Sequence, residues 1–192
     1  GLGARVSAST RNFGQGALTQ TGNPYDVAIQ GQGFFQVQMP DGTTAYTRDG
    51  AFQVDANGQL VTAAGHAVLP GITIPANAQG VTIDAQGVVS ARVPGQATAQ
   101  PLGTLQTANF VNPAGLEPRG GNLFAETAAS GTPDTAAPGG NGHGTLMAGA
   151  LEGSNVNVVE ELVSMIATQR AYELNSKAIQ TSDQMLQRLT QI

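Results

Sequence analysis

The sequence predicts a mainly β protein with a long C-terminal α-helix, in which a hairpin-rich β domain precedes a terminal, coiled-coil-forming helix. Three observations support this fold class. The 192 residues include 26 glycines and 10 prolines, a turn-rich composition that favours many short strands over a helical bundle. Between residues 24 and 123, short β-prone runs alternate with turn sequences. From Val158 onward, glycine and proline are absent and the apolar period becomes helical.

Changes in composition along the chain predict four segments. We expect an extended β linker over 1–23, a β-rich domain over 24–123, a Gly/Pro-rich loop with a return strand over 124–155, and the C-terminal helix over 156–192. Within the first segment, Ala4–Thr10 alternates in the manner of a strand. Residues 128–144 are nearly all small residues, proline or glycine, which predicts a long loop.

A weak internal repeat indicates one hairpin type used twice. The runs VDANGQLVTA and IDAQGVVSAR begin at Val54 and Ile83, and each has an aspartate followed by a glycine three residues later. Aspartate opens such turns by accepting hydrogen bonds from the following backbone, and glycine adopts the positive φ. This turn chemistry is a better account than a calcium loop, which needs more alternating oxygen ligands.

The run GQG at residues 31–33 is not a dinucleotide-binding fingerprint, because the third glycine is missing and a strand-like FFQVQM follows it. We expect a tight turn or bulge here, with one of Phe34 and Phe35 in the core.

The C-terminal helix is the most informative element. Asn157 and Glu160 have the spacing of a capping box. A helix over 158–190 would be about 50 Å long, longer than a β domain of roughly a hundred residues is wide. We therefore expect it to pair with a partner outside this sequence, although packing across its own β domain stays open. The candidate assembly interface is Val158, Leu162, Met165, Ile166, Tyr172, Ile179, Met185, Leu186 and Leu189.

The run NGHGTLMAGAL, from Asn141, resembles the histidine motif of subtilisin-type proteases. Such a site also needs an orienting aspartate and a serine motif. No serine motif is present, and the nearby Asp134 lies in a Pro/Gly-rich stretch. We predict a loop leading into a short strand, with His143 and His66 as solvated loop residues and without zinc-site spacing.

No catalytic, cofactor-binding or metal-binding residue is predicted, and no cofactor. A spatial pair of carboxylates for glycoside hydrolysis stays open, although carbohydrate clefts usually carry tryptophan and the chain has none.

Charge and hydropathy argue against nucleic acid and a membrane span, and in favour of protein partners. The eight basic and thirteen acidic residues give a net charge of −5, and the basic residues are scattered, which argues against nucleic acid. No apolar run is long enough to span a membrane, and no signal peptide is evident. Charged residues make up 11%, against roughly 25% in an average globular protein. So weakly charged a surface suits packing against copies or partners.

Three stretches identify the chain as similar to a known family. DVAIQGQGFFQV from Asp26, AYTRDGAFQVDANGQLVT from Ala45, and residues 152–192 resemble the axial proteins of the bacterial flagellum, the rod and hook proteins. The resemblance covers essentially the whole chain and is strongest to the distal-rod branch. That family begins with a helix containing an Asn-Asn-Leu-Ala-Asn signature, which is absent here. With Gly1 in place of an initiator Met, we expect this chain to lack roughly the first quarter of the protein.

The resemblance implies a structural subunit that polymerises helically into the hollow rod, with the terminal helices paired as an inner coiled coil and the β domain outside. Implied partners are further copies, other rod proteins, the hook protein and the surrounding periplasmic and outer-membrane rings, with no nucleic acid and no small-molecule substrate. It also implies export by the flagellar type III apparatus without a cleaved signal. A proximal rod or hook protein is one alternative, and a glycan-binding or hydrolytic β domain is another.

Overall fold

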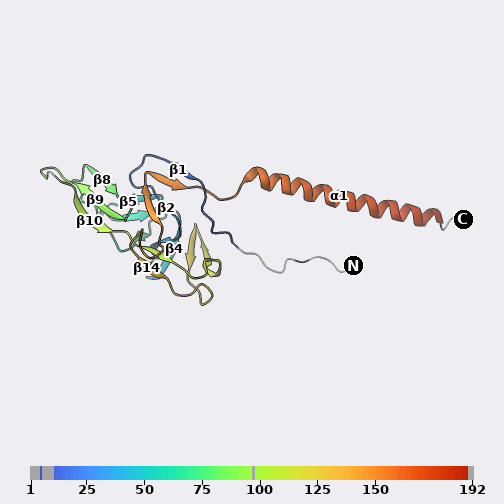
Figure 1. The fold of residues 1–192 in the computed structure, drawn as a ribbon, viewed down its shortest axis with the longest axis horizontal. Helices are drawn as coiled ribbons and strands as arrows, with labels where there is room; N and C mark the ends of the chain where they lie inside the picture. The colour runs from blue at the N-terminus through green and yellow to red at the C-terminus, as the bar shows by residue number, and fades with distance from the viewer. Residues whose placement is uncertain (1–4, 6–10, 97, 190–192) are drawn as a thin grey trace. The chain divides into compact units, whose positions relative to one another are not determined.

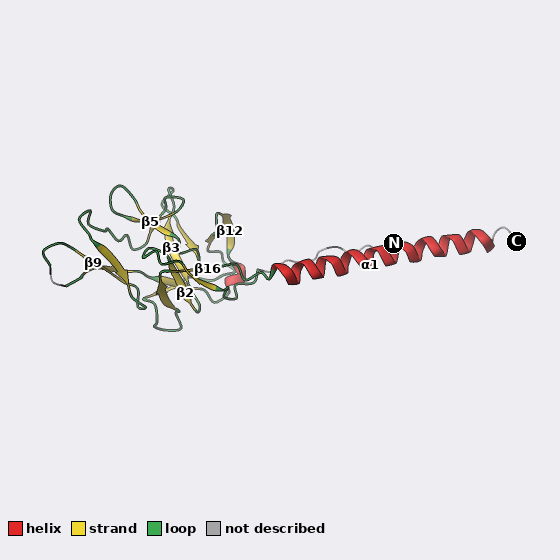
Figure 2. Cartoon of the chain, turned by 90° about the horizontal axis from the view of Figure 1, so that it is seen from above, coloured by secondary structure: helices red, strands yellow, loops and turns green. Residues whose placement is uncertain are grey.

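The computed structural model describes residues 5, 11–96 and 98–189, which divide into two compact units. A β unit comprises Gly1–Ser154 and a helical unit comprises Asn155–Ile192 (Figures 1 and 2). The expected strand over Ala4–Thr10 lies outside the described residues, apart from Arg5. The fold class predicted from the sequence is confirmed: hairpins build the first unit and one helix the second.

The largest sheet of the β unit is antiparallel and has nine strands. Its main path runs β12-β13-β4-β3-β7-β6-β5, and β11 joins β3 to β14. The strands are β3 (Phe34–Gln38), β4 (Thr44–Thr47), β5 (Phe52–Val54), β6 (Leu60–Thr62), β7 (Ala67–Val68), β11 (Thr107–Asn109), β12 (Glu117–Gly120), β13 (Leu123–Ala125) and β14 (Asp134–Ala136). A 3₁₀ turn, η1 (Pro113–Gly115), precedes β12. Strand β14 lies within the stretch expected to be loop.

The described residues of this unit also form three smaller antiparallel sheets. One has the order β10-β9-β8, and the others are the pairs β1-β16 and β2-β15. Their strands are β1 (Leu18–Gln20), β2 (Val27–Gln30), β8 (Gly80–Ile83), β9 (Val88–Arg92), β10 (Gln100–Thr104), β15 (Thr145–Ala148) and β16 (Ala150–Glu152). The run GTLMAGAL thus forms two strands separated by Gly149, which has a φ of 73°.

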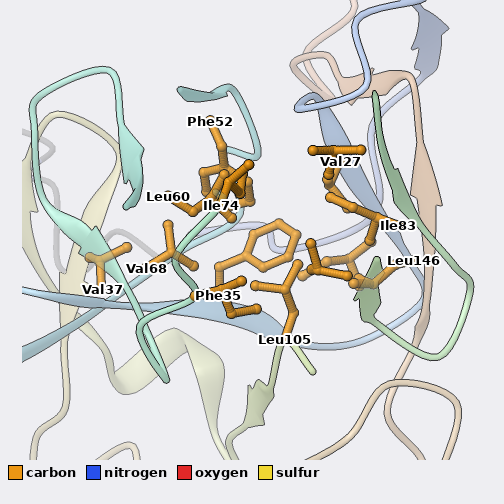
Figure 3. Close-up of a cluster of buried hydrophobic side chains, with 14 of the residues drawn as sticks. Val27, Phe35, Val37, Phe52, Leu60, Val68, Ile74, Ile83, Leu105 and Leu146 are labelled. Carbon is orange, nitrogen blue, oxygen red and sulfur yellow. The ribbon is translucent and has the colours of Figure 1, made fainter. Parts of the chain in front are cut away.

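One hydrophobic core joins the large sheet to the sheets β10-β9-β8 and β2-β15 (Figure 3). Phe35 of β3 lies at its centre, fully buried, with its ring centroid 4.9 Å from that of Phe52 in an edge-to-face arrangement. Val27 of β2, Ile83 of β8 and Leu146 of β15 pack into the same cluster. The sheets β10-β9-β8 and β2-β15 are therefore held to the large one by shared apolar burial, the main favourable term in folding.

Both phenylalanines after the GQG turn are buried, which corrects the expectation that only one would be. Phe35 faces the main core, whereas Phe34, on the opposite face of β3, is 3% exposed. Phe34 belongs to a second cluster with Tyr46 and Phe110, and the incoming segment adds Phe13, whose ring lies 5.6 Å away. Because successive side chains in a strand point to opposite faces, two adjacent buried residues mean that β3 is covered on both sides.

The repeated hairpin type predicted from the sequence is confirmed. Asp55 Oδ1 accepts the N–H groups of Asn57 and Gln59 at 2.8 and 2.7 Å. Asp84 Oδ1 does the same for Gln86 and Val88 at 3.0 and 2.8 Å. The glycines three residues after these aspartates have φ of 81° and 82°, so both turns follow from local chemistry.

The helical unit contains α1, which spans Val158–Leu189 without interruption (Figure 1). Asn157 precedes it, and its side-chain oxygen accepts the N–H of Val159 at 3.2 Å, an N-cap interaction. Glu160 and Glu161 occupy the first turn, where the helix dipole favours negative charge. Among the described residues, α1 lacks the apolar content that a membrane-spanning helix requires.

Candidate functional site

The candidate assembly surface is the apolar side-chain set of α1. Every described member is exposed, from 49% for Ile166 to 76% for Tyr172. The set comprises Val158, Leu162, Met165, Ile166, Tyr172, Ile179, Met185 and Leu186. Leu189 ends the helix backbone, and its side chain lies outside the described part. So many large apolar side chains in water are the signature of an interaction surface.

Residues seven apart make the main stripe of this surface. Seven residues advance a helix by about 700°, or roughly 20° short of two full turns. Val158, Met165 and Tyr172 therefore lie on one gently drifting line, which Ile179 and Leu186 continue. This periodicity is typical of helices that supercoil around a partner.

A second apolar group on α1 was missed by the heptad argument. Val159, Val163 and Leu174 are 69%, 60% and 68% exposed. At 100° per residue, Val163 and Leu174 point about 140° and 160° away from Val158. Met185 lies within about 20° of Leu174 on the same basis, so it belongs to this side. A helical-wheel count that included every apolar residue would have found this group.

His143 corrects the sequence prediction of a solvated loop residue, since its side chain is fully buried. Its Nδ1 lies 2.9 Å from the Thr107 hydroxyl oxygen, and its Nε2 lies 3.5 Å from Asp134 Oδ2. Asp134 is the first residue of β14 and pairs with Asn109 of β11. The ring therefore fastens the loop before β15 to strand β11 through Thr107, whereas its Nε2 makes no hydrogen bond within the described residues. His66, by contrast, is half-buried in the turn between β6 and β7.

These three residues are the types found in a hydrolytic triad, but their arrangement is wrong for that chemistry. In a serine protease the carboxylate binds Nδ1 and the nucleophile binds Nε2. Here the hydroxyl faces Nδ1 and the carboxylate faces Nε2. Thr107 is also 0% exposed, so its hydroxyl cannot reach a substrate. The histidine has a packing role.

A hollow lined by two carboxylates lies in the described part of the chain, and it bears on the glycoside-hydrolase alternative. The hollow has a volume of about 410 Å³ and includes Asp41, Tyr46, Arg119 and Glu126 in its lining. Hydrogen bonds from the Thr43 hydroxyl and N–H lower the pKa of Asp41. Burial and the neighbouring Glu126 raise the pKa of Tyr46 to about 12. A glycosidase needs a carboxylic acid with a raised pKa, which Asp41, a turn residue bonded to Thr43, does not provide.

Within the described residues, no three His, Asp or Glu side chains gather in a way that could hold a metal ion.

Residues 28–91 match the family model described as the flagellar hook protein FlgE/F/G D1 domain. Residues 147–192 match the flagellar basal body rod FlgEFG protein C-terminal model. A flagellar basal-body rod protein FlgG from Buchnera aphidicola subsp. Schizaphis graminum is 54% identical over all 192 residues, which span 74% of that relative. The chain belongs to the FlgG family of flagellar basal-body rod proteins.

Two other relatives allow this chain to be compared with both FlgG and FlgF rod proteins. FlgG of Caulobacter vibrioides is 48% identical over 192 residues, covering all of this chain and 73% of the relative. A FlgF rod protein from Escherichia coli is 38% identical over 199 aligned positions, covering 97% of this chain and 76% of the relative. Both of these FlgG relatives are more similar to this chain than this FlgF protein is. The two matched regions run from within β2 to within β9 and from within β15 through α1, so much of the core and the exposed helix are family features.

Proposed function

We propose that this protein is a non-enzymatic structural subunit of the flagellar distal rod, the hollow shaft that carries motor torque to the hook. The observation that carries the proposal is the exposed apolar stripe of α1, in a chain that matches FlgG rod proteins over its whole length. Burying one such side chain contributes roughly 1.5–3 kcal/mol. A helix with this many exposed apolar residues is therefore strongly driven towards a helical partner.

In the proposed assembly, copies of the protein associate head to tail. A heterologous contact of this kind need not close on itself, and it builds a helical filament. The stripe from Val158 to Leu186 packs in an inner layer of helices, and the β unit forms the outer wall. The remaining partners are other rod proteins, the hook protein and the rings that surround the rod. The protein acts in the basal body and reaches it through the flagellar type III apparatus.

The test uses two adjacent helix residues that differ in direction by about 100°. In a host deleted for this gene, the gene with Ile179→Glu should not restore motility or the distal rod in electron micrographs of purified hook–basal bodies. The gene with Gln180→Glu should restore both, because Gln180 is polar and exposed and glutamate and glutamine have similar helix propensity.

Complete rods and normal swimming in the deletion strain would refute the rod assignment. Equal complementation by both variants would refute the role of the stripe while leaving the rod assignment intact. Loss of the proximal rod in the deletion strain would favour a proximal subunit instead.

A further inference from the structure

The chain enters and leaves the β unit at one place. Strand β1 pairs with β16 in the antiparallel register Leu18↔Glu152 to Gln20↔Ala150 (Figure 1). One residue further out, the N–H of Gly153 donates to the carbonyl of Ala17 at 2.8 Å. The segment before residue 18 and the segment after residue 152 therefore diverge from the same end of this two-stranded ladder.

That end of the ladder is closed by Arg48, a residue that follows β4. Its Nε donates to Glu152 Oε2 at 2.9 Å, and its Nη2 lies 2.8 Å from the same oxygen. Nη1 donates to the carbonyls of Gly31 and Gly33, both at 3.0 Å. Nη2 also donates to the carbonyl of Ile29 at 3.3 Å. A guanidinium has five N–H donors, and these contacts provide an acceptor for each.

Glu152 extends this contact to the incoming segment. Its second carboxylate oxygen, Oε1, accepts the main-chain N–H of Gly16 at 2.8 Å. The side chains of Arg48 and Glu152 are only 16% and 9% exposed, so water screens their attraction less than it does a surface pair. The carboxylate of Glu152, in β16, thus binds both Arg48, which follows β4, and the segment that precedes β1.

Gln15 supports the same arrangement from the incoming segment. Its Nε2 donates to the carbonyl of Ile29 at 2.9 Å, and its Oε1 accepts the N–H of Gly31 at 3.1 Å. The amide therefore binds the turn whose carbonyls Arg48 also engages. Residues 15–20 are held to the rest of the unit by side-chain contacts at one end and by the ladder along their length.

Arg48, Glu152 and Gln15 lie where a pulling force on the two flanking segments would act on the β unit. When the two ends of an antiparallel ladder are pulled apart from the same side, the cross-strand bonds break one after another, beginning at the outermost pair. Here the outermost bond joins the N–H of Gly153 to the carbonyl of Ala17, and the pair Leu18↔Glu152 comes next. We propose that Arg48 and Glu152 form a clamp that prevents the β unit from opening at this point when load is applied through the segments that flank it. That the protein carries load rests on the proposed function, whereas the contacts between Arg48 and Glu152 are present in this chain whatever its function.

The first experiment measures hydrogen exchange by mass spectrometry on the full chain carrying Arg48→Lys or Glu152→Gln. Lysine keeps the charge but has no planar fork of five donors, and glutamine keeps the shape of Glu152 without its charge. In peptides covering 11–20 and 149–153, exchange should accelerate about tenfold or more, the factor expected when a charge-assisted hydrogen bond is lost. Peptides from the core strands β3 and β9 should be unchanged. Arg92→Lys, a swap at an exposed arginine, should behave as wild type.

The second experiment measures the clamp under force. Because the chain contains no cysteine, Arg11→Cys and Glu160→Cys provide unique attachment points for optical tweezers. Arg48→Lys and Glu152→Gln should add a short, low-force extension before the main unfolding event, as the strand containing Leu18 peels away. Wild type and Arg92→Lys should lack this step.

Three outcomes would overturn the proposal. One is unchanged exchange and unchanged force traces in both clamp variants. Another is an acceleration of exchange that is equal in the peptides covering 11–20 and 149–153 and in those from β3 and β9, which would indicate general destabilisation. The third is failure of even Glu152→Gln to fold. None of these results depends on whether the chain builds rods, so they are distinct from failure of the motility test.

Discussion

Replacing His143 with alanine should destabilise the β unit by about 2–4 kcal/mol. The imidazole is fully buried, so its removal leaves a space that the neighbouring loop fills only in part. Its loss also takes the ring nitrogen away from the Thr107 hydroxyl, which lies in a residue that is 0% exposed. A buried polar group that loses its partner costs about 1–3 kcal/mol, and lost packing adds to this.

Calorimetry is the suitable assay, because α1 dominates the circular dichroism signal while belonging to the other unit. For a chain of this size the unfolding midpoint should fall by roughly 5–15 °C. His66→Ala, at a half-buried turn position, should cost less than about 1 kcal/mol. In a Thr107→Val background, His143→Ala should cost about 1 kcal/mol less, because no hydroxyl then loses a partner. A midpoint unchanged by His143→Ala, or an equal cost in both backgrounds, would refute this reasoning.

Three further predictions follow from the same unit. Gly50→Ala should prevent stable folding, or cost more than about 4 kcal/mol in urea titration, because a Cβ there would overlap the Val27 carbonyl oxygen. Asp84→Ala should cost about 1–2 kcal/mol in the same titration, since two main-chain N–H groups lose their acceptor, whereas the exposed Asp183→Ala should change stability by less than about 0.5 kcal/mol. The pKa of Tyr46 is raised from 10.0 to about 12, so its contribution to stability is complete below pH 10 and is lost as pH rises through about 12. Tyr46→Phe should abolish that alkaline loss and remove the phenolate step near pH 12 from an absorbance titration.

The elements that could be predicted from the sequence are those with local causes. The turns at Asp55 and Asp84 contain both the hydrogen-bond acceptor and the glycine within four residues. The helix is predicted by its period and its cap, and its observed start at Val158 follows directly from Asn157. These features depend on residues a few positions apart and not on what packs against the segment, so they can be predicted without knowing the fold.

The features that could not be predicted depend on pairings between distant segments. Phe34 is buried because β11 brings Ala108 beside it, and nothing in the FFQVQM pattern indicates a second covered face. His143 is buried because β14 forms within a Gly/Pro-rich stretch, where composition predicted a loop. Arg48 and Glu152 are 104 residues apart, and three of the other acceptors of Arg48 are main-chain carbonyls, which carry no sequence signal.

The arrangement of charges links the weakly charged composition to the proposed assembly. Charged residues make up only 11% of the chain, and several of them act within the fold. Asp41, Asp55 and Asp84 accept main-chain N–H groups in turns, and Arg48 with Glu152 closes the ends of the β unit. Of these, Arg48 and Glu152 are largely buried, so they add little charge to the surface. Identical copies that lie side by side in a rod would repel one another little, because like charges on their facing surfaces are sparse, and the apolar stripe of α1 can then dominate their association.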